Sequence, residues 1–94
     1  MAKAIWKDTI IAESDKTIEV EGNQYFPPES IRKEYFISTS KHTTCPWKGV
    51  ASYYTIKIGD LENENGAWYY PEPKKAASEI KNYVAFWNGV RIES

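Results

Sequence analysis

The segment TTCPWKG, residues 43–49, contains the only cysteine of the chain and a lysine close to it. A thiol becomes a nucleophile when a cation, a helix N-terminus or a histidine stabilises its thiolate. His42 precedes Cys45 by three residues and Lys48 follows it by three, so the ingredients of a cysteine-based enzyme are present. A small, buried, inert cysteine before a turn proline is favoured, because free cysteines are among the most buried residues. Cys45 and Lys48 are the catalytic candidates, and the sequence leaves open whether the protein is an enzyme.

The same segment has the zinc-like spacing H-x-x-C at His42 and Cys45. A structural zinc site needs about four protein ligands, and a catalytic site about three. The chain has one histidine and one cysteine in total, which leaves either set incomplete. We therefore expect no metal site and no cofactor.

Phosphate-binding motifs are missing from the sequence. Neither G-x-G-x-x-G nor G-x-x-x-x-G-K-[ST] occurs, and Lys48-Gly49 is followed by a predicted strand where a phosphate loop would open a helix. Metal-assisted phosphoryl transfer usually requires paired carboxylates, whereas Asp8, Asp15 and Asp60 stand singly. The sequence gives no support to a nucleotide-handling enzyme.

Aromatic residues are the most unusual feature of the composition, with four Trp, seven Tyr and three Phe. They are too numerous to share one small core, so some of them are expected on a second surface where they line a ligand pocket. Lys48, or backbone N–H groups near Gly49, would meet an anionic or carbonyl group of the ligand. The ligand-binding candidates are Tyr25, Thr44, Cys45, Trp47, Lys48, Tyr53, Trp68 and Tyr70.

Two other interpretations of these aromatic residues stay open. A helix or loop that covers the second face would turn them into a second small core. Exposed aromatic residues also mark contact surfaces, so a homodimer or another protein-interaction domain is a further alternative.

The elements that must position these residues are mostly β-strands. Apolar, β-branched and aromatic residues between turn signals predict strands at 9–12, 17–21, 24–26, 35–37, 50–58, 67–70, 83–87 and 90–92. We expect a hairpin between 9–12 and 17–21, a polar loop at 59–66 that is the tip of a hairpin, and a hairpin turn at Asn88-Gly89. A short helix or 3₁₀ turn is expected at 31–34, and a short helix at 74–81.

Within the longest strand, alternation places Val50, Tyr54, Ile56 and Ile58 on one face, together with Ser52. Ala51, Tyr53, Thr55 and Lys57 point to the other face. Trp68 and Tyr70 likewise share a face.

Length and charge restrict the class of protein. The 94 residues make one domain, 1–94, and 41% hydrophobic with 27% charged residues is typical of an ordinary globule. A formal net charge of −1 is unfavourable for binding nucleic acid. There is no apolar stretch near the ~20 residues that span a bilayer, no apparent signal peptide, and no second cysteine for a disulfide. We expect a cytoplasmic protein that binds neither nucleic acid nor membrane.

Three segments of the chain carry a family resemblance: TTCPWKGVASYY, AWYYPEP and YVAFWNGVRIE. Together they resemble the bacterial domain-of-unknown-function family 427, which also carries a nucleotidyltransferase-like label. The similarity covers about residues 3–92. It implies a small mainly β domain of two antiparallel sheets that meet at an angle, a β-tent. Related tents include zinc-bearing domains and B-type methionine sulfoxide reductases, but the C-x-x-C ligand pairs of those proteins are absent here.

The residues thus favour a binding module with an aromatic-lined pocket for a small molecule or a modified group. An enzyme that uses Cys45 or Lys48, and a dimerising or protein-interaction domain, are the alternatives. The sequence names neither the ligand nor a partner.

Overall fold

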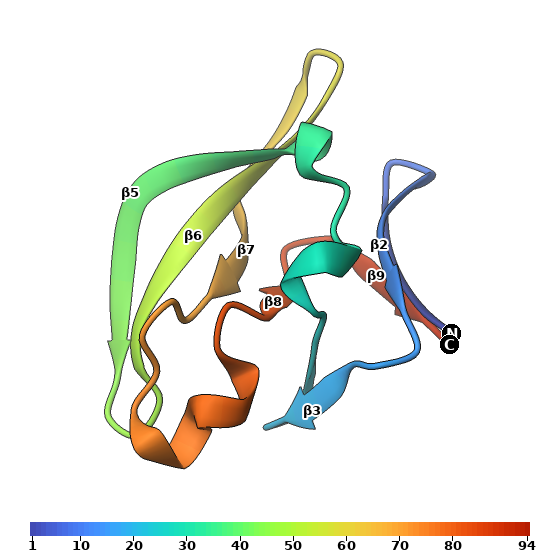
Figure 1. Ribbon diagram of the computed structural model, residues 1–94. Coiled ribbons are helices and arrows are strands. Elements are labelled where there is room, and N and C mark those ends of the chain that lie inside the picture. The colour runs from blue at the N-terminus through green and yellow to red at the C-terminus, as the bar shows by residue number, and fades with distance from the viewer.

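The computed structural model describes residues 1–94 as an assembly of antiparallel strands joined by short turns (Figure 1). Three 3₁₀ helices interrupt the strands: η1 (Pro28–Ser30), η2 (Lys33–Tyr35) and η3 (Lys75–Ile80). None of them has the length and apolar character that a membrane crossing requires. The strands are β1 (Ala2–Trp6), β2 (Thr9–Ser14), β3 (Ile18–Val20), β4 (Asn23–Tyr25), β5 (Phe36–Cys45), β6 (Gly49–Ile58), β7 (Leu61–Tyr69), β8 (Val84–Phe86) and β9 (Arg91–Glu93).

The strands form three antiparallel sheets, with the orders β5-β6-β7-β8, β2-β1-β9 and β3-β4. This confirms the prediction of a small, mainly antiparallel β protein. The N- and C-termini lie side by side because β1 pairs with β9, with Lys3 opposite Glu93 (Figure 1). The tent arrangement of the sheets stays a prediction from the family resemblance.

The two larger sheets share one hydrophobic core, which we call the first core cluster. Trp6 and Ile11 enter it from the three-stranded sheet, and Ile56 and Phe86 enter it from the four-stranded sheet. Phe26 lies between them and its backbone exchanges two hydrogen bonds with Val84, each 2.8 Å. Each sheet buries its inner face against the other.

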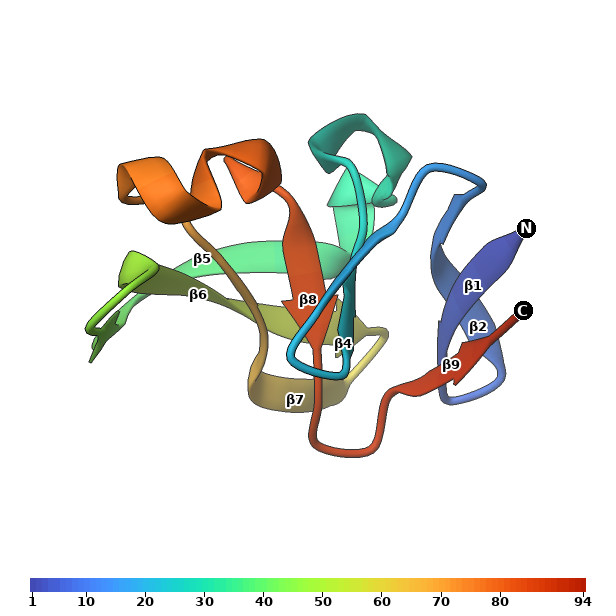
Figure 2. The same ribbon diagram turned by 90° about the horizontal axis from the view of Figure 1, so that it is seen from below.

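A second core cluster lies on the opposite face of the four-stranded sheet, where η3 covers it (Figure 2). Its buried members are Tyr25, Ala51, Tyr70, Ala77, Ile80 and Ala85, with Tyr53 and Trp68 packed against them. The predicted alternation along β6 is confirmed from Ala51 to Ile58, since Tyr54 and Ile56 pack in the first cluster and Ala51 and Tyr53 in the second. Val50 is 49% exposed near the start of β6, and it lines one surface cavity together with Ser52, which was predicted to share its face.

The predicted hairpin between residues 9–12 and 17–21 is wrong. Strand β2 pairs instead with β1, which the sequence did not reveal, and β3 pairs with β4. Lys7 and Asp8 make the β1–β2 turn with φ of 50° and 58°. Both residues occupy the left-handed region of a two-residue hairpin turn without the Asn-Gly pair that usually signals one.

The hairpin predicted around residues 59–66 is confirmed, since β6 pairs with β7, but the predicted polar loop is too long. The turn occupies only Gly59-Asp60, and β7 begins at Leu61. Pairing with β6 supplies backbone hydrogen bonds to this acidic segment, and Asn63 is buried in the sheet. A bulge interrupts the register between Tyr54 and Ile56.

The Asn88-Gly89 turn forms with positive φ at both residues, 54° and 95°, as expected for this pair. It does not make a hairpin, however. Strand β8 before the turn pairs with β7, and β9 after it pairs with β1, so the turn carries the chain from one sheet to another. The turn predicted at Asn88-Gly89 is therefore confirmed, and the hairpin pairing predicted for the strands on either side of it is wrong.

The predicted helices are short 3₁₀ segments. Near residues 31–34 the chain forms η1 and η2 on either side of Ile31, whose side chain is buried in the first core cluster. At residues 74–81 a non-helical Ala77, with φ −120° and ψ 20°, breaks η3 into two turns. Ala77 and Ile80 are buried as their spacing suggested.

Candidate functional site

The TTCPWKG segment is a strand, a three-residue turn and the start of another strand. Strand β5 runs to Cys45, which pairs with Gly49 at the start of β6, and residues 46–48 form the turn. Gly49 has a φ of 111°, a value that glycine adopts readily. The chain after Pro71 holds this turn in place, because the Lys74 amide donates to the Lys48 carbonyl at 2.9 Å and the Lys74 amine donates to the Pro46 carbonyl at 2.7 Å.

Lys48 is buried and makes an ion pair with Glu21, the residue that follows β3. Its amine lies over two aromatic rings, 5.2 Å from the centroid of Trp47 and 5.8 Å from that of Tyr70. The Trp47 indole N–H donates to the other carboxylate oxygen of Glu21 at 3.3 Å. These contacts compensate the charge of the lysine and fix its position.

Beside Lys48 lies an open cavity of about 310 Å³, which we call the tryptophan cavity. It is lined by Lys48, Tyr53, Trp68, Tyr70 and Trp87. The Trp68 indole is one wall of the cavity, and Tyr25 holds it from behind. The Trp68 N–H donates to the Tyr25 hydroxyl at 3.2 Å, and the two rings meet edge to face. The Tyr53 hydroxyl hydrogen-bonds to Thr43 at 2.9 Å. The walls are therefore positioned by contacts within the protein.

The structure brings four of the eight predicted ligand-binding residues to this cavity: Lys48, Tyr53, Trp68 and Tyr70. The other four lie elsewhere. Tyr25 is fully buried behind Trp68, Thr44 is exposed on β5, Cys45 is half-buried in the second core cluster, and Trp47 packs over Lys48 from outside the cavity.

Two residues of this region were absent from the sequence-derived site. Trp87 lines the cavity. It stands two residues after Ala85, a member of the second core cluster, so strand alternation could have predicted that both side chains lie on the same face. Glu21 pairs with Lys48, which is 27 residues away in the sequence, and no local sequence pattern predicts a contact over that separation.

Neither catalytic candidate is paired with a histidine. The single histidine, His42, has its Nδ1 3.3 Å from the Ser52 hydroxyl and makes no contact with Cys45. Burial alone would lower the pKa of Lys48, but the hydrogen bond to Glu21 and the nearby Tyr25 and Tyr70 raise it overall. A nucleophilic lysine needs a lowered pKa, so this environment disfavours covalent chemistry at Lys48. No three metal-binding side chains come together in the structure.

Burial raises the pKa of Tyr70 to about 12, against an opposing effect of Lys48. The phenol therefore keeps its proton at neutral pH and is a hydrogen-bond donor at the cavity. Because the folded pKa lies above the ordinary value of 10.0, the stability it contributes is complete below pH 10 and is lost as the pH rises toward 12.

An alkaline titration tests this assignment. We expect the tyrosinate absorbance to show a late step near pH 12 that Tyr70→Phe removes. The free energy of unfolding should also fall between pH 10 and pH 12, and fall less in the variant. An unchanged late step in Tyr70→Phe would contradict the assignment.

The fold and the cavity define a small, mainly antiparallel β domain with aromatic side chains gathered beside a buried lysine. The family model of a domain of unknown function, DUF427, matches residues 1–94, and the chain belongs to this family. No curated protein matches the sequence.

Proposed function

We propose that the protein is a binding module whose tryptophan cavity takes a flat, uncharged group that carries a carbonyl or similar acceptor. The observation that carries this proposal is the set of four aromatic side chains around the cavity, with the compensated Lys48 among them. Sites of this kind combine apolar walls with a few placed polar groups.

The charges favour an uncharged ligand. Glu21 already pairs with Lys48, so a bound anion would have to compete with that carboxylate. A lysine ammonium has three donors, and a carbonyl oxygen can accept from one that Glu21 leaves free. The protonated Tyr70 phenol is a second donor, since its pKa is about 12.

The wall geometry favours a flat ligand. Tyr53 on β6 is directly opposite Trp68 on β7, and Trp87 follows β8, the next strand of the sheet. The three aromatic rings therefore stand on neighbouring parts of the sheet. Offset or edge-to-face contacts with such rings increase the affinity of an aromatic ligand. The ligand class is thus a planar ring system with an amide, lactam or ketone.

Calorimetric titration with nicotinamide tests this proposal, because nicotinamide is planar, neutral and carries one amide. We expect binding that Trp87→Ala weakens by about three- to tenfold through loss of one stacking wall. Leu61→Ala is a matched control, since Leu61 and Trp87 are each 50% exposed and only Trp87 lines the cavity.

The fold of both variants is checked by circular dichroism, because the Trp87 indole also donates to the Asn65 carbonyl at 2.7 Å. Equal affinity of Trp87→Ala and the native chain would refute the proposal. So would a failure of nicotinamide and of related neutral aromatic amides to bind at all. Mass spectrometry under native conditions adds a direct test, since a ligand retained through purification would reveal its mass.

A further inference from the structure

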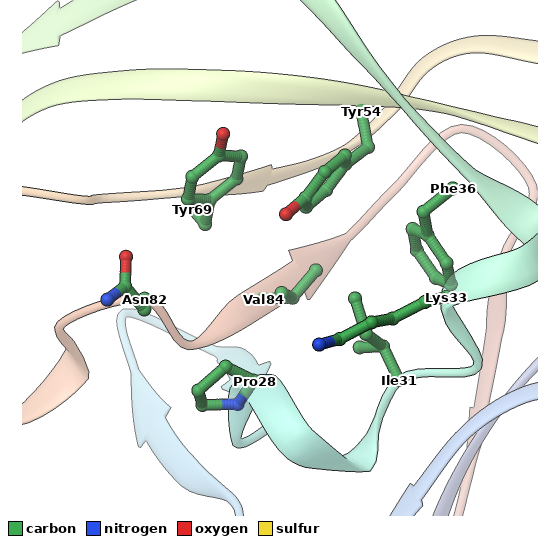
Figure 3. A pocket seen from close by; sticks show the side chains of 8 residues that line it. All are labelled: Pro28, Ile31, Lys33, Phe36, Tyr54, Tyr69, Asn82 and Val84. Atoms are coloured by element: carbon green, nitrogen blue, oxygen red, sulfur yellow. The ribbon is translucent and has the colours of Figure 1, made fainter.

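A second cavity lies on the other side of the four-stranded sheet, and we call it the tyrosine cavity (Figure 3). Its volume is about 300 Å³, which is at the small end of ligand sites and suits a single small molecule. Tyr54 and Tyr69, which line it, alternate along their strands with Tyr53, Trp68 and Tyr70 of the tryptophan cavity. The lining residues are Pro28, Ile31, Lys33, Phe36, Tyr54, Tyr69, Asn82 and Val84.

The apolar part of this cavity is preformed. Tyr54 and Tyr69 stack with their ring centroids 4.6 Å apart and their planes at 21°. Phe36 meets Tyr54 edge to face at 5.5 Å, and Ile31 and Val84 are anchored in the first core cluster. These contacts fix a hydrophobic surface that does not have to reorganise around a ligand, which lowers the cost of binding.

Two polar groups of this cavity make no hydrogen bond within the protein. They are the Lys33 amine and the Asn82 side-chain amide, and Lys33 also takes part in no ion pair. Figure 3 shows the Lys33 side chain reaching over the cavity, with its amine among the other lining residues.

The only charge in the lining of the tyrosine cavity is positive. Lys33 is the only ionised residue among the eight, and no carboxylate accompanies it. This differs from the tryptophan cavity, where Glu21 compensates Lys48. One unpaired ammonium beside an amide and a phenol suits a singly charged planar anion, whereas a phosphate dianion is usually held by several cations or backbone amides.

We propose that the tyrosine cavity is a binding site for a small aromatic carboxylate. The carboxylate pairs with Lys33 and accepts from Asn82, and the ring lies against the Tyr54–Tyr69 stack and Phe36. Burial, the neighbouring Tyr69 and a hydrogen bond to Tyr69 raise the pKa of Tyr54, so its phenol stays protonated in the wall of the cavity. This site is independent of the function proposed for the tryptophan cavity, and either can fail without the other.

Titration of ¹⁵N-labelled protein with 2-naphthoate, followed by NMR, tests the site. We expect saturable shifts in the amides of Val84 and Asn82, with little change at the indole N–H signals of Trp68 and Trp87. Lys33→Gln should weaken 2-naphthoate about fivefold, the scale of an exposed ion pair, because it removes the only cation of the lining. Lys57→Gln is the matched control, since Lys57 is also exposed but lies outside the cavity.

A neutral analogue separates charge from shape. 2-Naphthamide should bind native protein and Lys33→Gln with equal affinity, because it lacks the charge that Lys33 would pair with. Lys33 is exposed, so its replacement is not expected to unfold the protein, and unchanged amide dispersion confirms this. The proposal would be overturned if Lys33→Gln and native protein bound 2-naphthoate with equal affinity. It would also be overturned if no saturable shifts appeared, or if the shifts were confined to the tryptophan cavity.

Discussion

Replacing Phe26 by alanine is expected to lower the free energy of unfolding by about 3–5 kcal/mol. Phe26 is fully buried, and its ring meets Phe86 edge to face at 5.5 Å. It stands where the two larger sheets approach each other, so its removal leaves a void lined by residues of both. Because a domain of this size is stabilised by only about 5–15 kcal/mol in total, the variant should be close to unfolding.

Urea denaturation followed by circular dichroism measures this effect. The backbone hydrogen bonds between Phe26 and Val84 survive the substitution, so the loss reports the side chain alone. Ile37→Ala is the control, since Ile37 is 46% exposed and its loss should change the free energy by no more than about 0.5 kcal/mol. A loss below about 1 kcal/mol in Phe26→Ala would show that the sheets do not depend on this shared core.

Gly66→Ala is expected to cost about 1–3 kcal/mol, the range of overpacking in a well-filled interior. A Cβ at Gly66 would lie 2.6 Å from Cγ of Asn63 and 2.8 Å from its Oδ1. Asn63 cannot move aside freely, because its amide donates to the Asn88 carbonyl at 2.9 Å and accepts from the Asn88 amide at 3.0 Å. These bonds hold the turn that carries the chain from β8 to β9.

A double-mutant cycle identifies the cause. Asn63→Ala alone should cost about 1–2 kcal/mol through its lost hydrogen bonds. In Asn63→Ala/Gly66→Ala the clash is gone, so the combined loss should be smaller than the sum of the single losses. Additive losses in thermal or urea unfolding would show that the Asn63 side chain is not the obstacle.

Local residue patterns predicted some features of this fold, and contacts between residues distant in sequence decided the others. The alternation of Ala51 to Ile58 predicted which side chains share a face, because a strand with two covered faces needs apolar residues on both. The positive φ at Asn88 and Gly89 also followed from residue type. The pairing of the strands flanking that turn did not, since β8 and β9 join different sheets through contacts distant in sequence.

The candidate site divides in the same way. Lys48, Tyr53, Trp68 and Tyr70 were identified from residue type and alternation, and they line one cavity. Cys45, the only cysteine, was a catalytic candidate, yet it packs half-buried against the second core cluster without a histidine beside it. The role of Glu21 was not predictable, because its contact with Lys48 depends on where the β3–β4 sheet is placed.

The sequence by itself determined the β class, the family, the faces of the long strand and the aromatic character of the site. These properties depend on neighbouring residues and on composition. Only the tertiary structure decided that the aromatic residues form two cavities, that Glu21 compensates Lys48 and that Lys33 stays unpaired. Those outcomes depend on which strands pair and on how segments distant in sequence come into contact.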